Sequence, residues 1–212
     1  MLVPSLSDIR QAHSRIRPFI HRTPVMTSLL LDEIFGCSLF FKCENFQKAG
    51  AFKFRGATNA VLCLSEEERG RGVVTHSSGN HAAALALAAR MNNVTASIVM
   101  PENAPVVKKN AVAGYGGRIT FCKPTQKDRE ETTKSIMEKT GATLVHPYDN
   151  FNVICGQGTA ALELLDEKQG LEIVVAPVGG GGLLSGTSTT VKNISRETVV
   201  YGAEPLNVND AW

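Results

Sequence analysis

The sequence contains the stretch Ala51-Phe52-Lys53-Phe54-Arg55-Gly56-Ala57, in which a single lysine stands between two phenylalanines. Aromatic neighbours can exclude water from the ammonium group of Lys53, and this favours its neutral, nucleophilic amine. Far downstream, Gly179-Gly180-Gly181-Gly182 follows the apolar segment 173–178 and leads into a helix-like segment. A strand, a glycine loop and a helix in this order let backbone N–H groups converge on a phosphate. The two stretches predict a reactive lysine and a phosphate cradle.

A third stretch, Thr75-His76-Ser77-Ser78-Gly79-Asn80-His81, follows the strand-like segment 72–74 and opens the alanine-rich segment 82–89. A lysine that can form an imine and a cradle for a phosphate are the two features that an enzyme using pyridoxal 5'-phosphate requires. The sequence therefore predicts this cofactor.

Five segments resemble, in the same order, those of the fold-type II pyridoxal phosphate enzymes, and within them the serine racemase and serine/threonine dehydratase group. The segments are Lys42-Cys43-Glu44-Asn45-Phe46-Gln47, residues 51–57, Ser77-Ser78-Gly79-Asn80-His81, Gly156-Gln157-Gly158-Thr159 and residues 179–182. They span almost the whole chain. The resemblance implies a tryptophan synthase β-like α/β fold with open twisted parallel sheets, in which a small domain is inserted into a larger one and the cofactor lies between them.

Short apolar runs alternate with longer helical patterns, which is typical of parallel strands with crossover helices on both faces. Strands are expected at 38–42, 72–75, 96–100, 118–122, 143–146, 172–178 and 198–202, and helices at 57–68, 80–91, 106–115, 127–139 and 157–167. We expect a small domain at residues 56–148. The larger cofactor-binding domain, which we expect to be incomplete, would comprise residues 1–55 and 149–212.

The composition is that of an ordinary globular protein, with 43% hydrophobic and 20% charged residues among 212. A net charge of +2 without a basic cluster argues against a nucleic-acid partner. No apolar run approaches the ~20 residues of a membrane span, and the N-terminus does not have the pattern of a secretory signal. The five scattered cysteines favour a reducing, cytoplasmic location.

Lys53 is the candidate for covalent attachment of the cofactor and for one of two acid/base groups. Phe52 is expected beneath the pyridine ring, although an aromatic residue there is also compatible with plain core. Ser78 is the candidate acid/base group on the opposite face, and the resemblance implies that Asn80 binds the ring hydroxyl oxygen. Both residues have helix capping as an alternative role. We expect His81 to serve packing or to support the site from behind.

The cradle residues Gly179, Gly180, Gly181 and Gly182 are expected to bind the phosphate. A flexible turn is the alternative, but four consecutive glycines after a buried strand cost chain entropy, which favours a demand set by a ligand. The pattern is not a dinucleotide fingerprint, because the segment 199–201, about 20 residues on, is apolar where an acidic residue is expected.

Glu204, Val208 and Asp210 offer two carboxylates and a backbone carbonyl, which are hard oxygen ligands suited to Mg²⁺ or Ca²⁺. Serine racemases use a similar Glu-Pro segment for an activating divalent ion, whereas a solvated acidic turn is the alternative. The resemblance also implies a homodimer and a nucleotide effector, ATP, bound between subunits. The positions concerned are Ser28, Leu29, Leu30, Lys48 and Tyr115, with Ala49 in place of a common polar residue.

The function implied is racemisation of serine with β-elimination of serine to pyruvate and ammonia, on L-serine, D-serine and L-threonine. A threonine or threo-3-hydroxyaspartate ammonia-lyase is the alternative enzyme. A truncated, inactive family member is the alternative of another class, because the chain stops at Trp212 whereas family members continue and complete the larger domain.

Overall fold

The structure is a computed structural model that describes residues 3–207. The first half comprises α1 (Leu6–Ile16), β1 (Val25–Met26), α2 (Leu29–Phe35), β2 (Phe41–Lys42), the 3-10 turns Glu44–Phe46 and Lys48–Gly50, α3 (Lys53–Leu62), α4 (Glu66–Arg71), β3 (Val73–His76) and α5 (Asn80–Met91). The second comprises β4 (Ala96–Pro101), α6 (Val106–Gly114), β5 (Arg118–Cys122), α7 (Gln126–Thr140), β6 (Thr143–Leu144), α8 (Phe151–Glu167), β7 (Ile173–Pro177), α9 (Gly182–Ile194) and β8 (Val199–Ala203).

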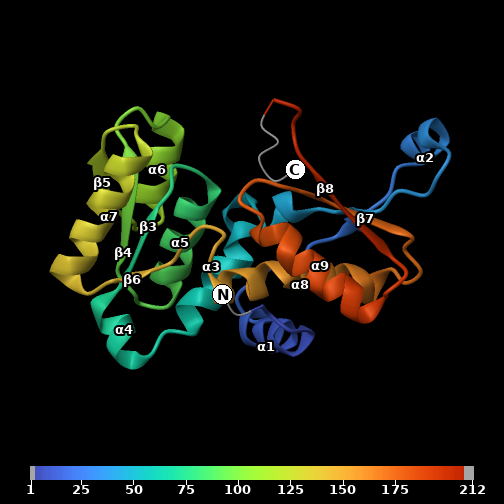
Figure 1. Ribbon diagram of the computed structural model, residues 1–212, viewed down its shortest axis with the longest axis horizontal. Coiled ribbons are helices and arrows are strands. Elements are labelled where there is room, and N and C mark those ends of the chain that lie inside the picture. Colours follow the sequence, from blue (N-terminus) through green and yellow to red (C-terminus); the bar gives the residue numbers. More distant parts are fainter. Residues whose placement is uncertain (1–2, 208–212) are drawn as a thin grey trace.

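Strands β3 to β6 form a parallel sheet in the order β5-β4-β3-β6, as the alternating pattern predicted (Figure 1). Successive side chains of a strand point to opposite faces. Val73 accordingly belongs to an apolar cluster with Leu85 of α5, whereas Val74 belongs to a separate cluster with Met137 of α7. Helices therefore cover both faces, as a parallel sheet requires.

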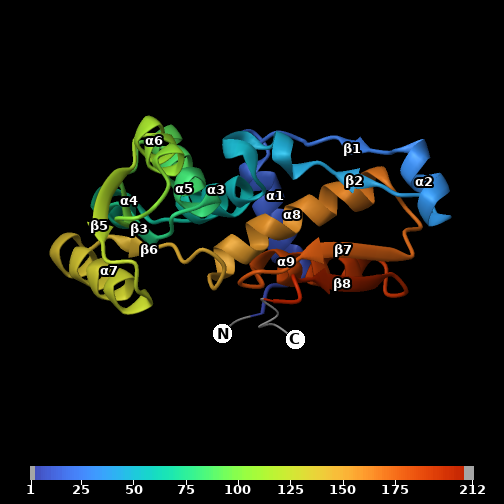
Figure 2. The ribbon, with the colours of Figure 1, turned by 90° about the horizontal axis from the view of Figure 1, so that it is seen from above.

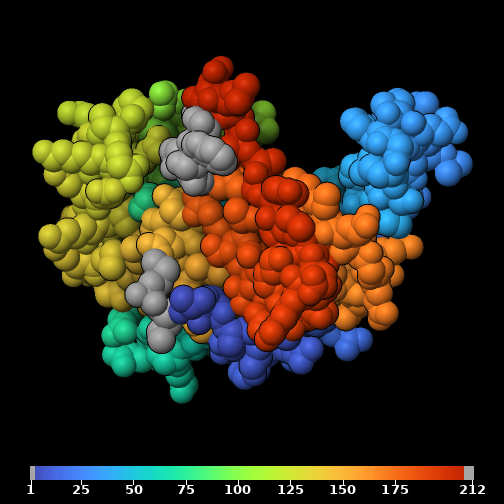
Figure 3. Space-filling view, turned by 45° about the vertical axis from the view of Figure 1, so that its right-hand side comes forward, coloured from blue at the N-terminus to red at the C-terminus, as the bar shows by residue number. Residues whose placement is uncertain are grey.

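The remaining strands form two pairs beside α8 and α9 (Figure 2). Strands β7 and β8 are parallel, whereas β1 and β2 are antiparallel, which differs from the all-parallel expectation. The difference arises because α2, which joins β1 to β2, projects away from the body and does not cross over a sheet (Figures 1 and 3). None of the residues of α2 is buried.

Glycines bring α8 unusually close to its two neighbours. A Cβ atom on Gly156 would lie 2.6 Å from the Cα of Gly56 in α3, and one on Gly158 would lie 2.9 Å from the carbonyl oxygen of Gly186 in α9. Larger residues would force the helices apart. The Oε1 atom of Gln157 also accepts the backbone N–H of Gly56 at 3.3 Å. The Gly-Gln-Gly segment, one of the five that resemble the family, thus has a packing role.

Arg55 carries a fully buried positive charge between two carboxylates. Its guanidinium makes two contacts of 2.8 Å with Glu44 and two of 2.8 Å with Glu163. Lys42 adds a third link, with its Nζ 2.9 Å from Glu163. Burial alone would raise the pKa of Glu163, but hydrogen bonds from His13, Arg55 and Lys42 outweigh it and lower this pKa. The network ties α3 and α8 to the segment that follows β2.

Several expected boundaries are wrong. The helix expected at 57–68 is two helices, because Ser65 and Glu68 form a capping box that starts α4. The helix expected at 157–167 begins at Phe151, after the cap Asn150, and the strands expected at 38–42 and 143–146 are reduced to β2 and β6. Helix α3 also crosses the predicted domain boundary after residue 55, so the division into domains remains a prediction.

The helix contact at Gly156 predicts opposite effects for two helical glycines. Gly156→Ala should lower the free energy of unfolding by about 1–3 kcal/mol despite its better helix propensity, because the new methyl group overlaps the backbone of α3. Gly70→Ala in α4 is the control. Nothing lies within 4 Å of its would-be Cβ, and a gain of up to about 1 kcal/mol is expected. Urea unfolding measures both, and equal effects would contradict the close contact.

The buried network predicts that Glu163→Gln is strongly destabilising, by about 3–5 kcal/mol, because Arg55 and Lys42 each lose one of their two carboxylate partners. The folded-state pKa of Glu163 is lowered, so its contribution is present above about pH 4.3 and is lost as the pH falls. Urea unfolding of the parent and of Glu163→Gln at pH 7 and at pH 3 should show that the substitution lowers the free energy of unfolding less at pH 3 than at pH 7. Glu131→Gln, which breaks the exposed pair with Lys127, should leave stability nearly unchanged.

Candidate functional site

Lys53 begins α3 and is partly buried. Its Nζ donates a hydrogen bond of 2.7 Å to the carbonyl oxygen of Pro147 and lies 5.2 Å from the centroid of the Phe52 ring. Burial lowers the pKa of Lys53 to about 8, so a sizeable neutral fraction exists at mildly alkaline pH. Phe54, the other expected neighbour, lies in the apolar core instead. The amine has the character that attack on an aldehyde requires.

The loop 77–79 joins the C-terminal end of β3 to the start of α5. Ligands of open α/β sheets bind at this edge, where strand ends and helix N-termini meet. The N-cap of α5 is Gly79, and no side chain caps the helix. Ser78 and Asn80 therefore do not have the capping role that was their alternative. Within residues 3–207 neither side chain has a hydrogen-bond partner, so both are available to a ligand.

Three aromatic side chains at the same edge were missed by the sequence reasoning. His76 ends β3, and His146 follows β6 at the matching level, because Val74 pairs with Leu144. The ring centroids of the two histidines are 5.5 Å apart, and the ring of Tyr148 lies 4.6 Å from that of His146. The sequence alone does not reveal this cluster of three rings, because the cluster forms only when β3 and β6 are neighbours in the sheet.

Burial lowers the pKa of His76 and of His146, so both imidazoles are neutral near pH 7. His146 Nδ1 accepts the backbone N–H of Asp149 at 2.9 Å, which places its proton on Nε2. His81 is fully buried, with its Nε2 3.1 Å from the carbonyl oxygen of Val145, and burial lowers its pKa to about 3. The choice between packing and support of the site, the two roles expected for His81, therefore remains a prediction.

Of the four cradle glycines, Gly179 to Gly181 lie between the end of β7 and α9, and Gly182 is the first residue of α9. Gly181 has φ of 81°, a left-handed conformation that favours glycine, and no side chain caps α9. The first N–H groups of the helix have no intrahelical partner. Their donor character and the positive end of the helix dipole fit a phosphate group.

Direct contacts link these parts around the segment 146–148. The carbonyl of Pro147 holds Lys53, and the next residue, Tyr148, lies against Gly180 and Gly182. The preceding residue, His146, meets the ring of His76, which leads into the loop 77–79. These residues fit pyridoxal phosphate, since the cradle would hold its phosphate, Lys53 its aldehyde carbon and Asn80 its ring hydroxyl oxygen.

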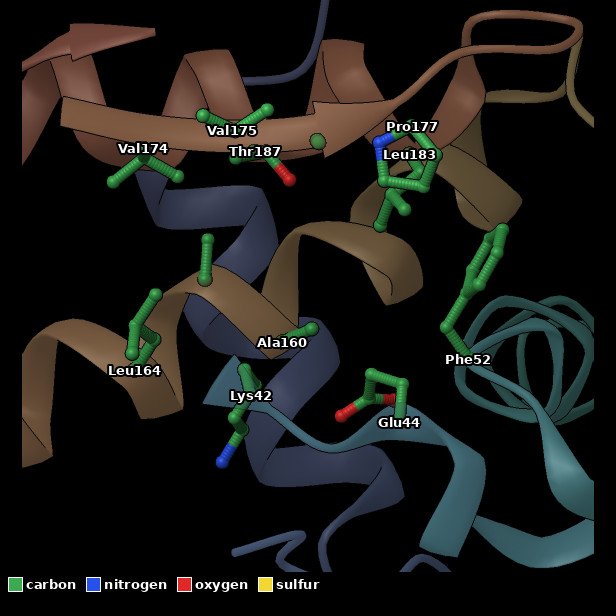
Figure 4. A pocket seen from close by; sticks show the side chains of 12 residues that line it. Lys42, Glu44, Phe52, Ala160, Leu164, Val174, Val175, Pro177, Leu183 and Thr187 are labelled. Atoms are coloured by element: carbon green, nitrogen blue, oxygen red, sulfur yellow. The ribbon is translucent and has the colours of Figure 1, made fainter. Parts of the chain in front are cut away.

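A separate pocket of about 210 Å³ lies between β7, α8 and the segment 42–52 (Figure 4). It is mostly apolar. Its lining residues are Lys42, Glu44, Phe52, Ala160, Ala161, Leu164, Val174, Val175, Ala176, Pro177, Leu183 and Thr187. Phe52 is the only predicted site residue among them, so its stacking role remains a prediction.

Of the predicted cation ligands, Glu204 follows β8, and Val208 and Asp210 lie outside the described residues. In the described part of the chain, no group of three or more His, Cys, Asp or Glu side chains is arranged to hold a metal ion. The divalent-ion site therefore remains a prediction.

Comparison with known proteins supports the same assignment. The family model described as "Pyridoxal-phosphate dependent enzyme" matches residues 16–211. The chain is 50% identical over its full length to a serine racemase of Dictyostelium discoideum and 50% identical to a β-hydroxyaspartate dehydratase of Paracoccus denitrificans. It spans 65% and 67% of the lengths of these two relatives.

The crystal structure of the Dictyostelium discoideum serine racemase superimposes with a TM-score of 0.97 at 50% sequence identity, covering 100% of this chain and 69% of that one. A tryptophan synthase β-like architecture and a family match over most of the sequence thus agree with the geometry of the site. The chain belongs to the fold-type II pyridoxal-phosphate dependent enzymes, the family that includes the serine racemases.

Proposed function

We propose that this chain acts on serine-like amino acids with pyridoxal phosphate, racemising serine and eliminating its β-hydroxyl group to yield pyruvate and ammonia. The observation that carries the proposal is the convergence of Lys53, the loop 77–79 and the glycine cradle around residues 146–148. The serine racemase at 50% identity supports it.

The bound cofactor supplies an electron-withdrawing ring that makes the substrate Cα proton acidic. Lys53 then moves this proton on one face, since a pKa of about 8 gives it both neutral and protonated forms at mildly alkaline pH. Ser78 holds a proton on the opposite face, where its weakly acidic hydroxyl needs help from a neighbouring charged group to release and regain that proton. The N–H groups at the start of α5 bind the substrate carboxylate.

A 3-hydroxyaspartate ammonia-lyase is the second candidate. The β-hydroxyaspartate dehydratase of Paracoccus denitrificans is as similar to this chain as the serine racemase is. Both reactions begin with proton removal by Lys53, so they place the same demands on the residues described. A threonine ammonia-lyase and an inactive member are the other outcomes that an assay can return.

We also propose a homodimer with ATP and a divalent cation as effectors. The dimer is supported by α2, whose Leu29, Leu30, Ile34 and Phe35 are highly exposed on a projecting arm (Figure 3). Ser28 caps this helix, so the predicted nucleotide positions begin on the same arm. In residues 3–207, no helix is long and apolar enough to cross a bilayer.

The lowered pKa of Lys53 predicts the pH at which it reacts with the aldehyde of pyridoxal phosphate. Reductive trapping with borohydride, read by mass spectrometry, should label Lys53 with a half-maximal rate near pH 8. Nα-acetyl-lysine, whose side-chain amine is free, should reach its half-maximal rate in the same buffer at a pH about 2 units higher. Lys53→Arg should remove the label. If the labelling rate of Lys53 has the same pH dependence as that of the free lysine derivative, the lowered pKa of the buried Lys53 amine would be contradicted.

Ser78→Ala should separate the two outcomes of the proposed chemistry. Racemisation of L-serine should fall by about 10²–10⁴-fold, because the second face loses its proton donor, while elimination to pyruvate falls less. Ser65→Ala, which removes only the cap of α4, should leave the ratio unchanged. Turnover of L-serine, D-serine, L-threonine and 3-hydroxyaspartate on one preparation identifies the substrate.

Loss of elimination with intact racemisation would contradict the assignment of Ser78. If 3-hydroxyaspartate alone is turned over, the second candidate is correct. If Lys53 is labelled but no amino acid is turned over, the inactive alternative is correct.

A further inference from the structure

Three of the four cradle glycines are constrained, for two different reasons. A Cβ on Gly180 would overlap the ring of Tyr148, and a Cβ on Gly182 would lie 2.9 Å from the carbonyl oxygen and 3.1 Å from the Cα of Tyr148. Gly181 is favoured as glycine because its φ is 81°. Nothing lies within 4 Å of a Cβ on Gly179, so this position has no such constraint. Two of the four positions are therefore constrained by one tyrosine of a distant segment.

Tyr148 is itself held in place from both sides. The ring of His146 meets it edge-on, with the planes at 85°. On the other side, the side chain of Asn150 caps α8 by accepting the backbone N–H of Val153 at 3.0 Å. Between them, the carbonyl of Pro147 accepts the hydrogen bond from Lys53. The position of Tyr148 is thus set by the sheet, by α8 and by the lysine.

We propose that Tyr148 is a positioning residue for the phosphate cradle, whose ring and backbone hold Gly180 and Gly182 so that the N–H groups at the start of α9 face a phosphate. The proposal rests on the proposed function, since it takes the phosphate of pyridoxal phosphate as the ligand. A loop ordered before binding costs less entropy when the ligand arrives, so this contact increases affinity for the phosphate.

The ring, and not the hydroxyl, carries this role. In the described residues the Tyr148 hydroxyl makes no hydrogen bond, whereas the ring makes the contacts with Gly180 and His146. Phenylalanine should therefore replace tyrosine here, and alanine should not. The same geometry predicts that Gly180→Ala is harmful only while the ring is present.

The test measures equilibrium binding of pyridoxal phosphate and of pyridoxal, which lacks the phosphate, together with the rise in Tm caused by inorganic phosphate. Tyr148→Ala should weaken pyridoxal phosphate binding by about tenfold and reduce the effect of inorganic phosphate, with pyridoxal binding unchanged. Tyr148→Phe should stay within about twofold of the parent. Tyr201→Ala, at an exposed tyrosine of β8, is the matched control.

A double mutant separates the contact from the cofactor. Gly180→Ala should lower Tm in the parent background, and less so in combination with Tyr148→Ala. Additive effects on Tm would overturn the proposal. So would equal weakening of pyridoxal and pyridoxal phosphate, or a parent protein that does not respond to phosphate. If inorganic phosphate raises the Tm of the parent but pyridoxal phosphate never attaches to Lys53, the proposed function would be contradicted. The positioning role of Tyr148 would still be supported.

Discussion

The close approach of α8 to α3 and α9 is the constraint on which the site depends. Glycines at both crossings remove the side chains that would hold these helices apart. Lys53 lies one turn before the first crossing, at Gly56, and the cradle ends one turn before the second, at Gly186. Since α8 contacts both helices, the distance between the lysine and the phosphate cradle is set by backbone packing. Backbone contacts cannot adjust as flexible side chains do.

The buried charges around Arg55 add orientation to this packing. Arg55 follows Lys53 by two residues, and its guanidinium is fastened to Glu163 on α8 and to Glu44 beside β2. A planar guanidinium with bidentate contacts on two sides resists rotation of the helix that carries it. The start of α3, and with it Lys53, is therefore held in a fixed direction.

The motifs of the site could be predicted from the sequence, whereas the segment that links them could not. Residues 51–57, the loop 77–79 and the glycine cradle could each be predicted from local residue types, because strand ends, helix starts and glycine runs have local signatures. The contacts that link these three parts through residues 146–148 could not be predicted in this way. The roles of His146 and Tyr148 depend on β3 lying beside β6 and on the loop after β7 folding back against this segment.

The sequence alone determined the fold class, the alternation of strands and helices from β3 to β8, the cofactor and the family, since periodicity and short motifs are properties of neighbouring residues. It did not predict α1, β1 or α2. It did not place the break between α3 and α4 or the start of α8, where capping side chains decide the boundary. Only the tertiary structure decided why Gly156, Gly158, Gly180 and Gly182 must be glycine. Each of these positions is limited by an atom that is distant in the chain and near in space, and such contacts leave no mark in the local pattern.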